Sequence, residues 1–296
     1  MATQRTVDDY LTILQSISDD RLNDKKRWLK ACEFNSFFYA LKDGHISISS
    51  AQESHVFNHL NAVVENIDLD DELRAECLGL IACGFATHGF MTEKNRAYGV
   101  VSLATTSSNK ALRHRALTFF ARCIETKIFP QKSELFYNAY DILVDSWNMC
   151  KDTETGLLLA KSFIDIVMND KRPDKDTAIS DSTPYQTRYA GPLSDSLKGL
   201  PYIMMDSLIY GERDTTGKRS FDVQKQICQG LLRCYEAGRF DNDAFMALTV
   251  LDKCQNFIWP GLQGKIVEDF NRYSGNHFPN IFLHEKLSRI AHLVLD

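Results

Sequence analysis

The sequence predicts an all-α protein, an α-solenoid of antiparallel helix pairs of the HEAT or armadillo type. Apolar residues recur at the spacing of one helix face along nearly the whole chain, as in Leu135, Phe136, Ala139 and Leu143. Alternating β-branched patterns, which are typical of strands, are nearly absent. Helix-stop and helix-start signals recur about 40 residues apart, which is within the period of HEAT and armadillo pairs.

Short links with stop and start signals separate the predicted helices. They lie around Gly44, Gly89, Lys127 and Gly238. In each, a helical stripe ends, an apolar residue follows, and a Ser, Thr, Asp or Pro opens the next helix. The apolar residue is expected to close the end of the hairpin. This punctuation divides the chain into about six hairpins, each able to bury its apolar stripe only against a neighbour.

The apolar stripes between these links place the individual helices. Leu112, Ala116 and Phe120 mark one helix face, and Leu283, Leu287 and Ile290 mark another. The stretch HISISS after Gly44 fits a link and a helix cap better than a strand. In chain order, the predicted helices span 7–17, 24–43, 51–66, 71–88, 93–106, 109–126, 132–149, 153–169, 194–210, 219–237, 241–257, 262–273 and 279–295.

One long polar segment interrupts the series. Residues 169–193 contain three prolines and four aspartates and few apolar residues. A structureless link of this length is uncommon in a compact domain, so it is either disordered or functional. We predict one domain over residues 1–296 with a flexible insertion at 170–193. The insertion carries Ser180, Ser182, Thr183 and Tyr185, which kinases could reach.

A pattern of two cysteines around a glycine occurs twice, as CLGLIAC from Cys77 and as CQGLLRC from Cys228. Cysteines six positions apart on a helix are turned by about 240° around its axis, so they cannot hold one zinc ion together. They are better interpreted as small buried apolar residues. Gly79 and Gly230 would then lie mid-helix, where glycine costs about 1 kcal/mol against alanine, and this favours close packing by another helix. No metal or other cofactor is predicted.

Composition and charge narrow the class of protein. The chain of 296 residues is 44% hydrophobic, carries a net charge of −5 and has eight cysteines. With a sequence pI near 5.9, the bulk composition does not favour nonspecific DNA binding, although a local basic patch could still bind. No apolar run is long enough to span a bilayer, and the first residues lack the core of a secretory signal. We therefore expect a soluble intracellular protein with reduced cysteines.

Three blocks of the sequence, in this order, resemble the C-terminal HEAT repeats of the condensin G subunit family. They are DELRAECLGLIACGF, ALRHRALTFFARCIETKIF, and, after the polar insertion, FDVQKQICQGLLRCYEAGRFDNDAFMALTVLDKC. The similarity covers about 70 to 260, and the insertion is less acidic than in the family. The matched positions are Cys77, Leu78, Gly79, Ala116, Leu117, Gly230, Leu231, Gly238 and Arg239.

The resemblance implies a non-catalytic subunit that binds the kleisin of an SMC complex and holds double-stranded DNA in mitotic chromosome condensation. Its location would be the nucleus or chromosome and the cytoplasm. DNA would be held through Lys and Arg contacts to phosphates, without base readout. The predicted DNA contacts are Lys110, Arg113 and Arg115, near His114, and Lys218 and Arg219, with Lys25, Lys26 and Arg27 as a third basic cluster.

Other chemistry has weaker support in the sequence. His55 and His59 could share a helix face, as could His284 and His292, but neither pair has a third metal ligand. The chain has no nucleophile elbow and no phosphate-binding loop. The alternatives to a condensin subunit are an unrelated HEAT-type scaffold or adaptor and a HEAT-like DNA glycosylase. We expect no enzyme.

Overall fold

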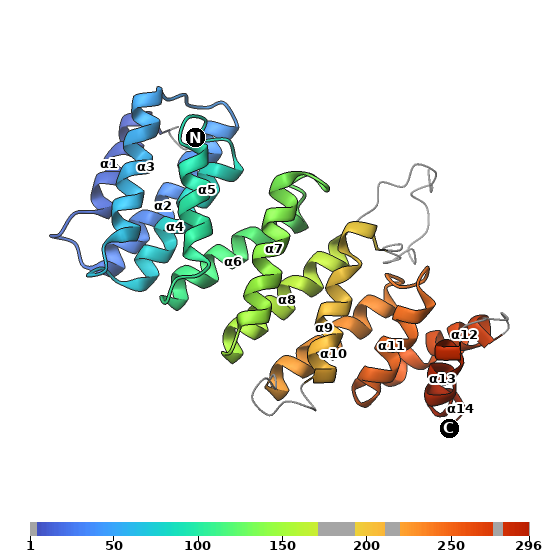
Figure 1. The fold of residues 1–296 in the computed structure, drawn as a ribbon. Coiled ribbons are helices and arrows are strands. Elements are labelled where there is room, and N and C mark those ends of the chain that lie inside the picture. Colours follow the sequence, from blue (N-terminus) through green and yellow to red (C-terminus); the bar gives the residue numbers. More distant parts are fainter. Residues whose placement is uncertain (1–4, 171–192, 211–219, 275–280, 296) are drawn as a thin grey trace. The chain divides into compact units, whose positions relative to one another are not determined.

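The computed structural model describes residues 5–170, 193–210, 220–274 and 281–295 (Figure 1). Within these ranges the regular structure consists of helices, and no strand occurs. The predicted all-α fold is therefore confirmed. The predicted flexible insertion falls almost entirely on residues outside the described ranges.

The helix bounds follow the predicted ranges closely, with two differences. The predicted helix at 194–210 begins as a 3-10 turn, and the regular helix starts at Gly199, where Pro201 can occupy the first turn without a missing hydrogen bond. The predicted final helix at 279–295 is wrong as one piece, because it is interrupted at Ala291.

The α-helices are, in chain order, α1 (Val7–Ile17), α2 (Asp24–Lys42), α3 (Ser50–Glu65), α4 (Asp71–Ala86), α5 (Lys94–Ala104), α6 (Lys110–Glu125), α7 (Glu134–Met149), α8 (Thr153–Asn169), α9 (Gly199–Tyr210), α10 (Phe221–Glu236), α11 (Ala244–Cys254), α12 (Gln263–Ser274), α13 (Ile281–Ile290) and α14 (His292–Leu295). Short 3-10 helices lie at η1 (Asp195–Leu197), η2 (Gln255–Phe257) and η3 (Pro260–Leu262). None of the described helices is long and apolar enough to cross a membrane.

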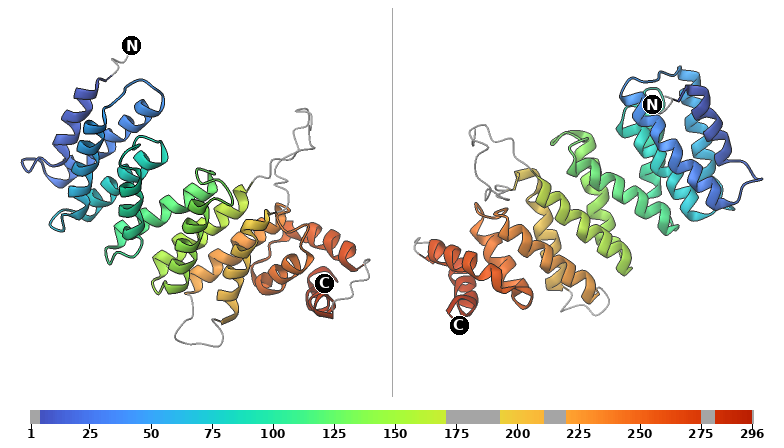
Figure 2. Two further views of the ribbon diagram at one scale, coloured as in Figure 1. Left: turned by 45° about the horizontal axis from the view of Figure 1, so that its top comes forward. Right: turned by 180° about the vertical axis from the view of Figure 1, so that it is seen from behind.

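The contacts divide the chain into two compact units. Unit 1 comprises residues 1–123 with 138–146, and unit 2 comprises residues 124–137 with 147–296. In unit 1, α2 packs on α1 and α4, and α4 also packs on α3 and α5 (Figures 1 and 2). In unit 2, α10 packs on α8, α9 and α11, and α11 packs on α13. Helices of successive pairs thus cover one another, as the repeat model requires. The prediction of one domain over 1–296 stays a prediction.

Side-chain caps mark most helix starts. In each case the side chain of the residue before the helix accepts a hydrogen bond from a backbone N–H in the first turn, which satisfies a donor that has no partner within the helix. These caps are Thr6, Asn23, Ser49, Asp70, Ser133, Asp152, Ser220 and Asp243.

The four predicted stops end in left-handed residues, each followed two positions later by an apolar residue. The left-handed residues have φ of 71° at Gly44, 58° at His88, 61° at Lys127 and 74° at Gly238. At the second stop the residue is His88, not Gly89 as the sequence suggested, and Gly89 instead lies against Phe38. The apolar residues are the half-buried Ile46 and the buried Phe90, Phe129 and Phe240. They close the hairpin ends as expected.

Polar contacts within each unit repeat with the period of the helix pairs. Equivalent positions of successive pairs touch because each pair repeats the path of the one before. The spacing is 38 to 40 residues in Glu53 with Thr92 and Glu93, Ser54 with Glu93, Asn58 with Arg96, Asp71 with Asn109, Glu76 with Arg115, and Gln131 with Asp170.

The two mid-helix glycines are sites of close approach, as predicted. A Cβ atom on Gly79 would lie 2.2 Å from Nε of Arg115, which reaches over α4 from α6. A Cβ atom on Gly230 would lie 2.0 Å from Cδ1 of Ile164, which reaches α10 from α8. Any larger residue would therefore displace a neighbouring side chain at either position.

Candidate functional site

The predicted DNA contacts are placed unequally. Lys110 is exposed at the start of α6, whereas Arg113 is half-buried. Nη1 of Arg113 donates a hydrogen bond of 2.7 Å to the Ser107 carbonyl. Lys218 and Arg219 lie outside the described residues. The Arg113 side chain thus already has a hydrogen-bond partner within the protein.

Arg113 belongs to a recurring arrangement in unit 1. An arginine at the fourth position of the second helix of a pair donates to a backbone carbonyl near the end of the first helix. Arg27 on α2 donates 2.7 Å to the Ile17 carbonyl, and Arg74 on α4 donates 3.0 Å to the Val64 carbonyl. Such carbonyls lack intrahelical partners, so the arginines stabilise the turns.

Of the third basic cluster, Lys25 and Lys26 are exposed and Arg27 is buried.

Arg115 also makes internal contacts. Its Nη2 lies 3.0 Å from Oε2 of Glu76, and its guanidinium covers Gly79. Its side chain is 44% exposed, so one side remains open to solvent. Among the predicted contacts within the described residues, Lys110 and Arg115 are both exposed.

A buried polar network fastens the two ends of the polar insertion in unit 2. Arg239, which is 1% exposed, donates 2.8 Å from Nε to the Val167 carbonyl, and its Nη2 donates to the Asp170 carbonyl. The Leu193 N–H donates 3.1 Å to the Arg239 carbonyl. Asp170 and Leu193, the described residues at the two ends of the insertion, thus lie beside one buried guanidinium, which the resemblance had marked only as a matched position.

The Asp170 carboxylate extends this network. It accepts 3.0 Å from Nε2 of Gln131 and 2.8 Å from the backbone N–H of Ser194. Gln131 comes from the link between α6 and α7, and Arg239 from the link between α10 and α11. Three successive links between pairs are therefore joined. Sequence reasoning missed this role of Arg239; its place directly after the left-handed Gly238 is the signal that points to it.

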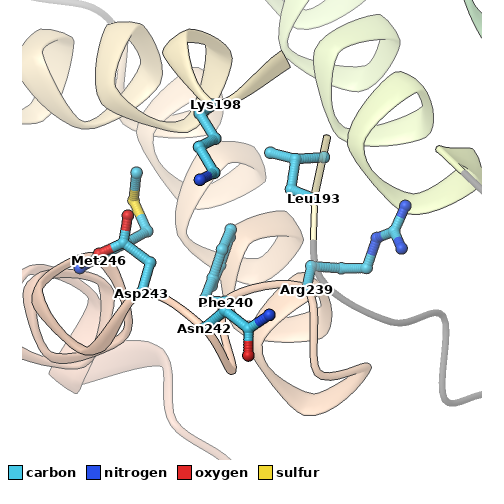
Figure 3. A pocket seen from close by; sticks show the side chains of 7 residues that line it. All are labelled: Leu193, Lys198, Arg239, Phe240, Asn242, Asp243 and Met246. Atoms are coloured by element: carbon cyan, nitrogen blue, oxygen red, sulfur yellow. Dashed lines mark hydrogen bonds between the residues drawn. The ribbon is translucent and has the colours of Figure 1, made fainter. Parts of the chain in front are cut away.

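A small hollow lies beside this network (Figure 3). Its volume is about 50 Å³. Lys198, between η1 and α9, enters it and pairs with Asp195 at 2.8 Å, while Asp243 caps α11 by accepting 2.9 Å from the Met246 N–H. Figure 3 shows the Arg239 side chain directed away from the hollow, toward α8. The lining residues are Leu193, Lys198, Arg239, Phe240, Asn242, Asp243 and Met246. The charged groups have partners here, and the space suits one small side chain.

A second buried network in unit 2 centres on Asp269 of α12. Tyr235 Oη donates 2.7 Å to its Oδ2, Arg272 donates 2.7 Å to its Oδ1, and Lys265 lies 3.3 Å from Oδ2. Burial, followed by the hydrogen bond to Asp269, raises the pKa of Tyr235 far above its ordinary value. Tyr235 therefore stays protonated and acts as a donor. The network ties α12 to α10, and Lys265 also pairs with Asp241 at 3.1 Å, so two cations face two carboxylates.

Burial keeps three of the cysteines in the neutral form. Burial raises the pKa of Cys83 to about 11 and that of Cys123 and Cys234 to about 12, so these thiols are protonated at neutral pH. Among the described residues no group of three His, Cys, Asp or Glu side chains is arranged to hold a metal ion.

The predicted histidine pair lies on one face of α3. The ring centroids of His55 and His59 are 6.1 Å apart. His59 Nε2 lies 2.9 Å from the Ser18 hydroxyl, and burial, with the nearby His55, lowers the pKa of His59. His59 therefore packs between α3 and the end of α1. His284 belongs to α13 and His292 to α14.

Comparison with known proteins does not identify a family for this chain. No family model matches the chain, and no curated protein matches its sequence. A crystal structure of an engineered protein is similar at 12% identity over 96% of each chain, with a TM-score of 0.38. A likeness of this strength carries no argument about fold or function.

Proposed function

We propose that this chain is a non-catalytic helical-repeat subunit that binds an extended segment of another protein, and that its partner is the kleisin of a chromosome-organising SMC complex. The observation that carries the proposal is the 38-to-40-residue period of contacts between equivalent positions. Helix pairs stacked in this way present equivalent faces side by side, a surface suited to long peptide partners. The order of the three sequence blocks that resemble the condensin G subunit supports the kleisin as that partner.

The resemblance also implies DNA holding in mitotic chromosome condensation, with the protein located in the nucleus or on the chromosome and in the cytoplasm. Arg113 and Arg115 make contacts within the protein, and these contacts explain the presence of the two arginines without bound DNA. The DNA-holding part of the proposal therefore rests on the sequence resemblance. Protein binding is therefore the activity to test first.

The test is titration calorimetry of the full chain with overlapping kleisin peptides of the source genome. A scrambled peptide of the same composition is the matched control. We expect one segment to bind with a Kd of about 1 μM or tighter and the scrambled peptide to bind at least tenfold more weakly. Equal binding of every segment and of the scrambled control would rule out the kleisin proposal.

A further inference from the structure

Two turns in unit 1 expose large apolar side chains to solvent. Ile67, in the turn between α3 and α4, is 81% exposed, and Leu103, at the end of α5, is 75% exposed. Single exposed apolar residues are common on protein surfaces. Two such residues on adjacent turns of one unit are less easily explained by chance exposure.

The two turns are adjacent because side chains join them. Nδ2 of Asn109, which precedes α6, donates to Oδ1 of Asp71 at the start of α4. The same Asn109 caps α6 through the Leu112 N–H, at 3.1 Å, so its position is fixed from both sides. Figures 1 and 2 show both turns at the same end of unit 1. Ile67 and Leu103 therefore belong to one edge, which we call the turn edge.

Negative charge surrounds Ile67 on the turn edge. Asp70 and Asp71 are committed to the start of α4 and to Arg74, whose guanidinium is directed inward to the Val64 carbonyl at 3.0 Å. Lys110 is the exposed cation of the neighbouring turn. The exposed carboxylates between positions 65 and 72 are Glu65, Asp68, Asp70, Asp71 and Glu72.

We propose that the turn edge, formed by Ile67 and Leu103 with Asp68 and Glu72, is a docking surface for a basic, apolar segment of a partner protein. Burial of Ile67 and Leu103 would supply the apolar contact, and the carboxylates would select Lys or Arg next to the partner's apolar residues. The same negative charge disfavours an anionic membrane as the occupant. The inference goes beyond the proposed function, because it assigns a surface and a partner chemistry that do not require a kleisin.

The test uses the full chain and two synthetic 14-residue peptides with leucines at the same helical positions. The polar positions are all lysine in one peptide and all glutamate in the other. Binding is measured by fluorescence anisotropy at 0.05 and 0.3 M NaCl. We expect the Lys/Leu peptide to bind at least tenfold more tightly than the Glu/Leu peptide at the lower salt concentration, and to weaken at the higher one. Failure of the Lys/Leu peptide to bind, or equal binding of both peptides, would overturn the proposal.

Surface variants locate the binding. Ile67→Ser with Leu103→Ser should weaken the Lys/Leu peptide at least tenfold, and Asp68→Asn with Glu72→Gln should weaken it threefold or more and reduce the salt dependence. Met91→Ser is the matched control, since Met91 is 70% exposed in the link between α4 and α5 and should leave binding unchanged. Circular dichroism checks that each variant is folded. An equal loss in Met91→Ser would contradict the assignment.

Two other occupants are outcomes of the same experiment. Self-association that is abolished in the Ile67→Ser, Leu103→Ser variant would assign the turn edge to a second copy of the chain. Binding to phosphatidylserine vesicles that is lost in that variant would assign it to a membrane. Either result would overturn the proposal. Kleisin binding is a separate readout, so failure of one proposal leaves the other standing.

Discussion

Helix α4 in unit 1 and helix α10 in unit 2 carry the same cysteine–glycine pattern but place it on different faces. Their caps and stops align at a spacing of 150 residues: Asp70 with Ser220, and His88 with Gly238. Their glycines, Gly79 and Gly230, are 151 residues apart. One residue turns a helix by about 100°, so the two glycines face different neighbours.

The difference in neighbour follows from this shift. Gly79 is covered by Arg115 from the following α6, and Gly230 by Ile164 from the preceding α8. Position 84, a glycine packed on Phe38 and Phe90, corresponds to Cys234, and Gly89 corresponds to Arg239. Helix caps, more than short internal patterns, therefore set which residues of the two helices are equivalent.

Substitution of Arg239 should have the largest effect on the free energy of unfolding. The equivalent position in unit 1 is Gly89, which has no side chain to make such contacts. Arg239→Met keeps the side-chain volume but leaves two buried carbonyls without their donor, so the free energy of unfolding should fall by about 3 kcal/mol. Urea unfolding followed by tryptophan fluorescence measures this, with the buried Trp147 as a reporter in unit 2.

Arg74→Met is the matched control in unit 1. It removes one bond to a helix-end carbonyl and a surface ion pair, and should cost about 1–2 kcal/mol. A loss in Arg239→Met no larger than in Arg74→Met would contradict the fastening role of Arg239.

Gly230→Ala should destabilise unit 2. Its Cβ would lie 2.0 Å and 2.5 Å from Cδ1 and Cγ1 of the buried Ile164. Overpacking of this kind costs about 1–3 kcal/mol, against about 1 kcal/mol returned by the helix propensity of alanine, so we expect a net loss of up to about 2 kcal/mol. Ile164→Ala removes both of these atoms at a cost of its own, and in its presence Gly230→Ala should cost much less than it does alone. Additive losses in a double-mutant cycle would show that the clash is not the cause.

Cys234 should make unit 2 sensitive to alkaline pH. The pKa of its thiol is raised from 9.0 to about 12 by burial. The unfolded chain therefore loses this proton at lower pH, and the stability from the neutral buried thiol is complete below pH 9 and is lost as the pH rises toward 12. Between pH 8 and pH 10, Cys234 should account for a loss of about 1 kcal/mol. Urea unfolding of Cys234→Ala over this range should show a shallower slope; an unchanged slope would refute the assignment.

Gly79→Ala should have the smallest effect. The guanidinium over Gly79 is the far end of a flexible side chain, 44% exposed, that can swing away. Losing its ion pair with Glu76 costs up to about 1 kcal/mol, and alanine returns about 1 kcal/mol, so stability should change by less than about 0.5 kcal/mol. Thermal unfolding measures the difference, and a large loss would indicate that Arg115 is held as firmly as Ile164.

The sequence was sufficient to predict the helices, their caps and the close approach at both glycines, because these depend on local spacing and on residue size. It did not distinguish Gly79 from Gly230, since which helix covers a glycine depends on rotation set by caps elsewhere. It placed Arg113 and Arg115 among candidate DNA contacts because a cluster of basic residues has the same sequence pattern whether its arginines contact phosphates or backbone carbonyls. Arg239 was missed because its two acceptors lie about 70 residues away along the chain.

The 2.8 Å hydrogen bond from the Ser194 N–H to the Asp170 carboxylate holds the end of α8 next to the segment that leads into η1. The segment between these two residues should therefore tolerate shortening, lengthening or replacement by a foreign peptide while α8 and η1 keep their positions. The fold thus offers a place where a tag or a reporter domain can be grafted, provided that Arg239 is kept.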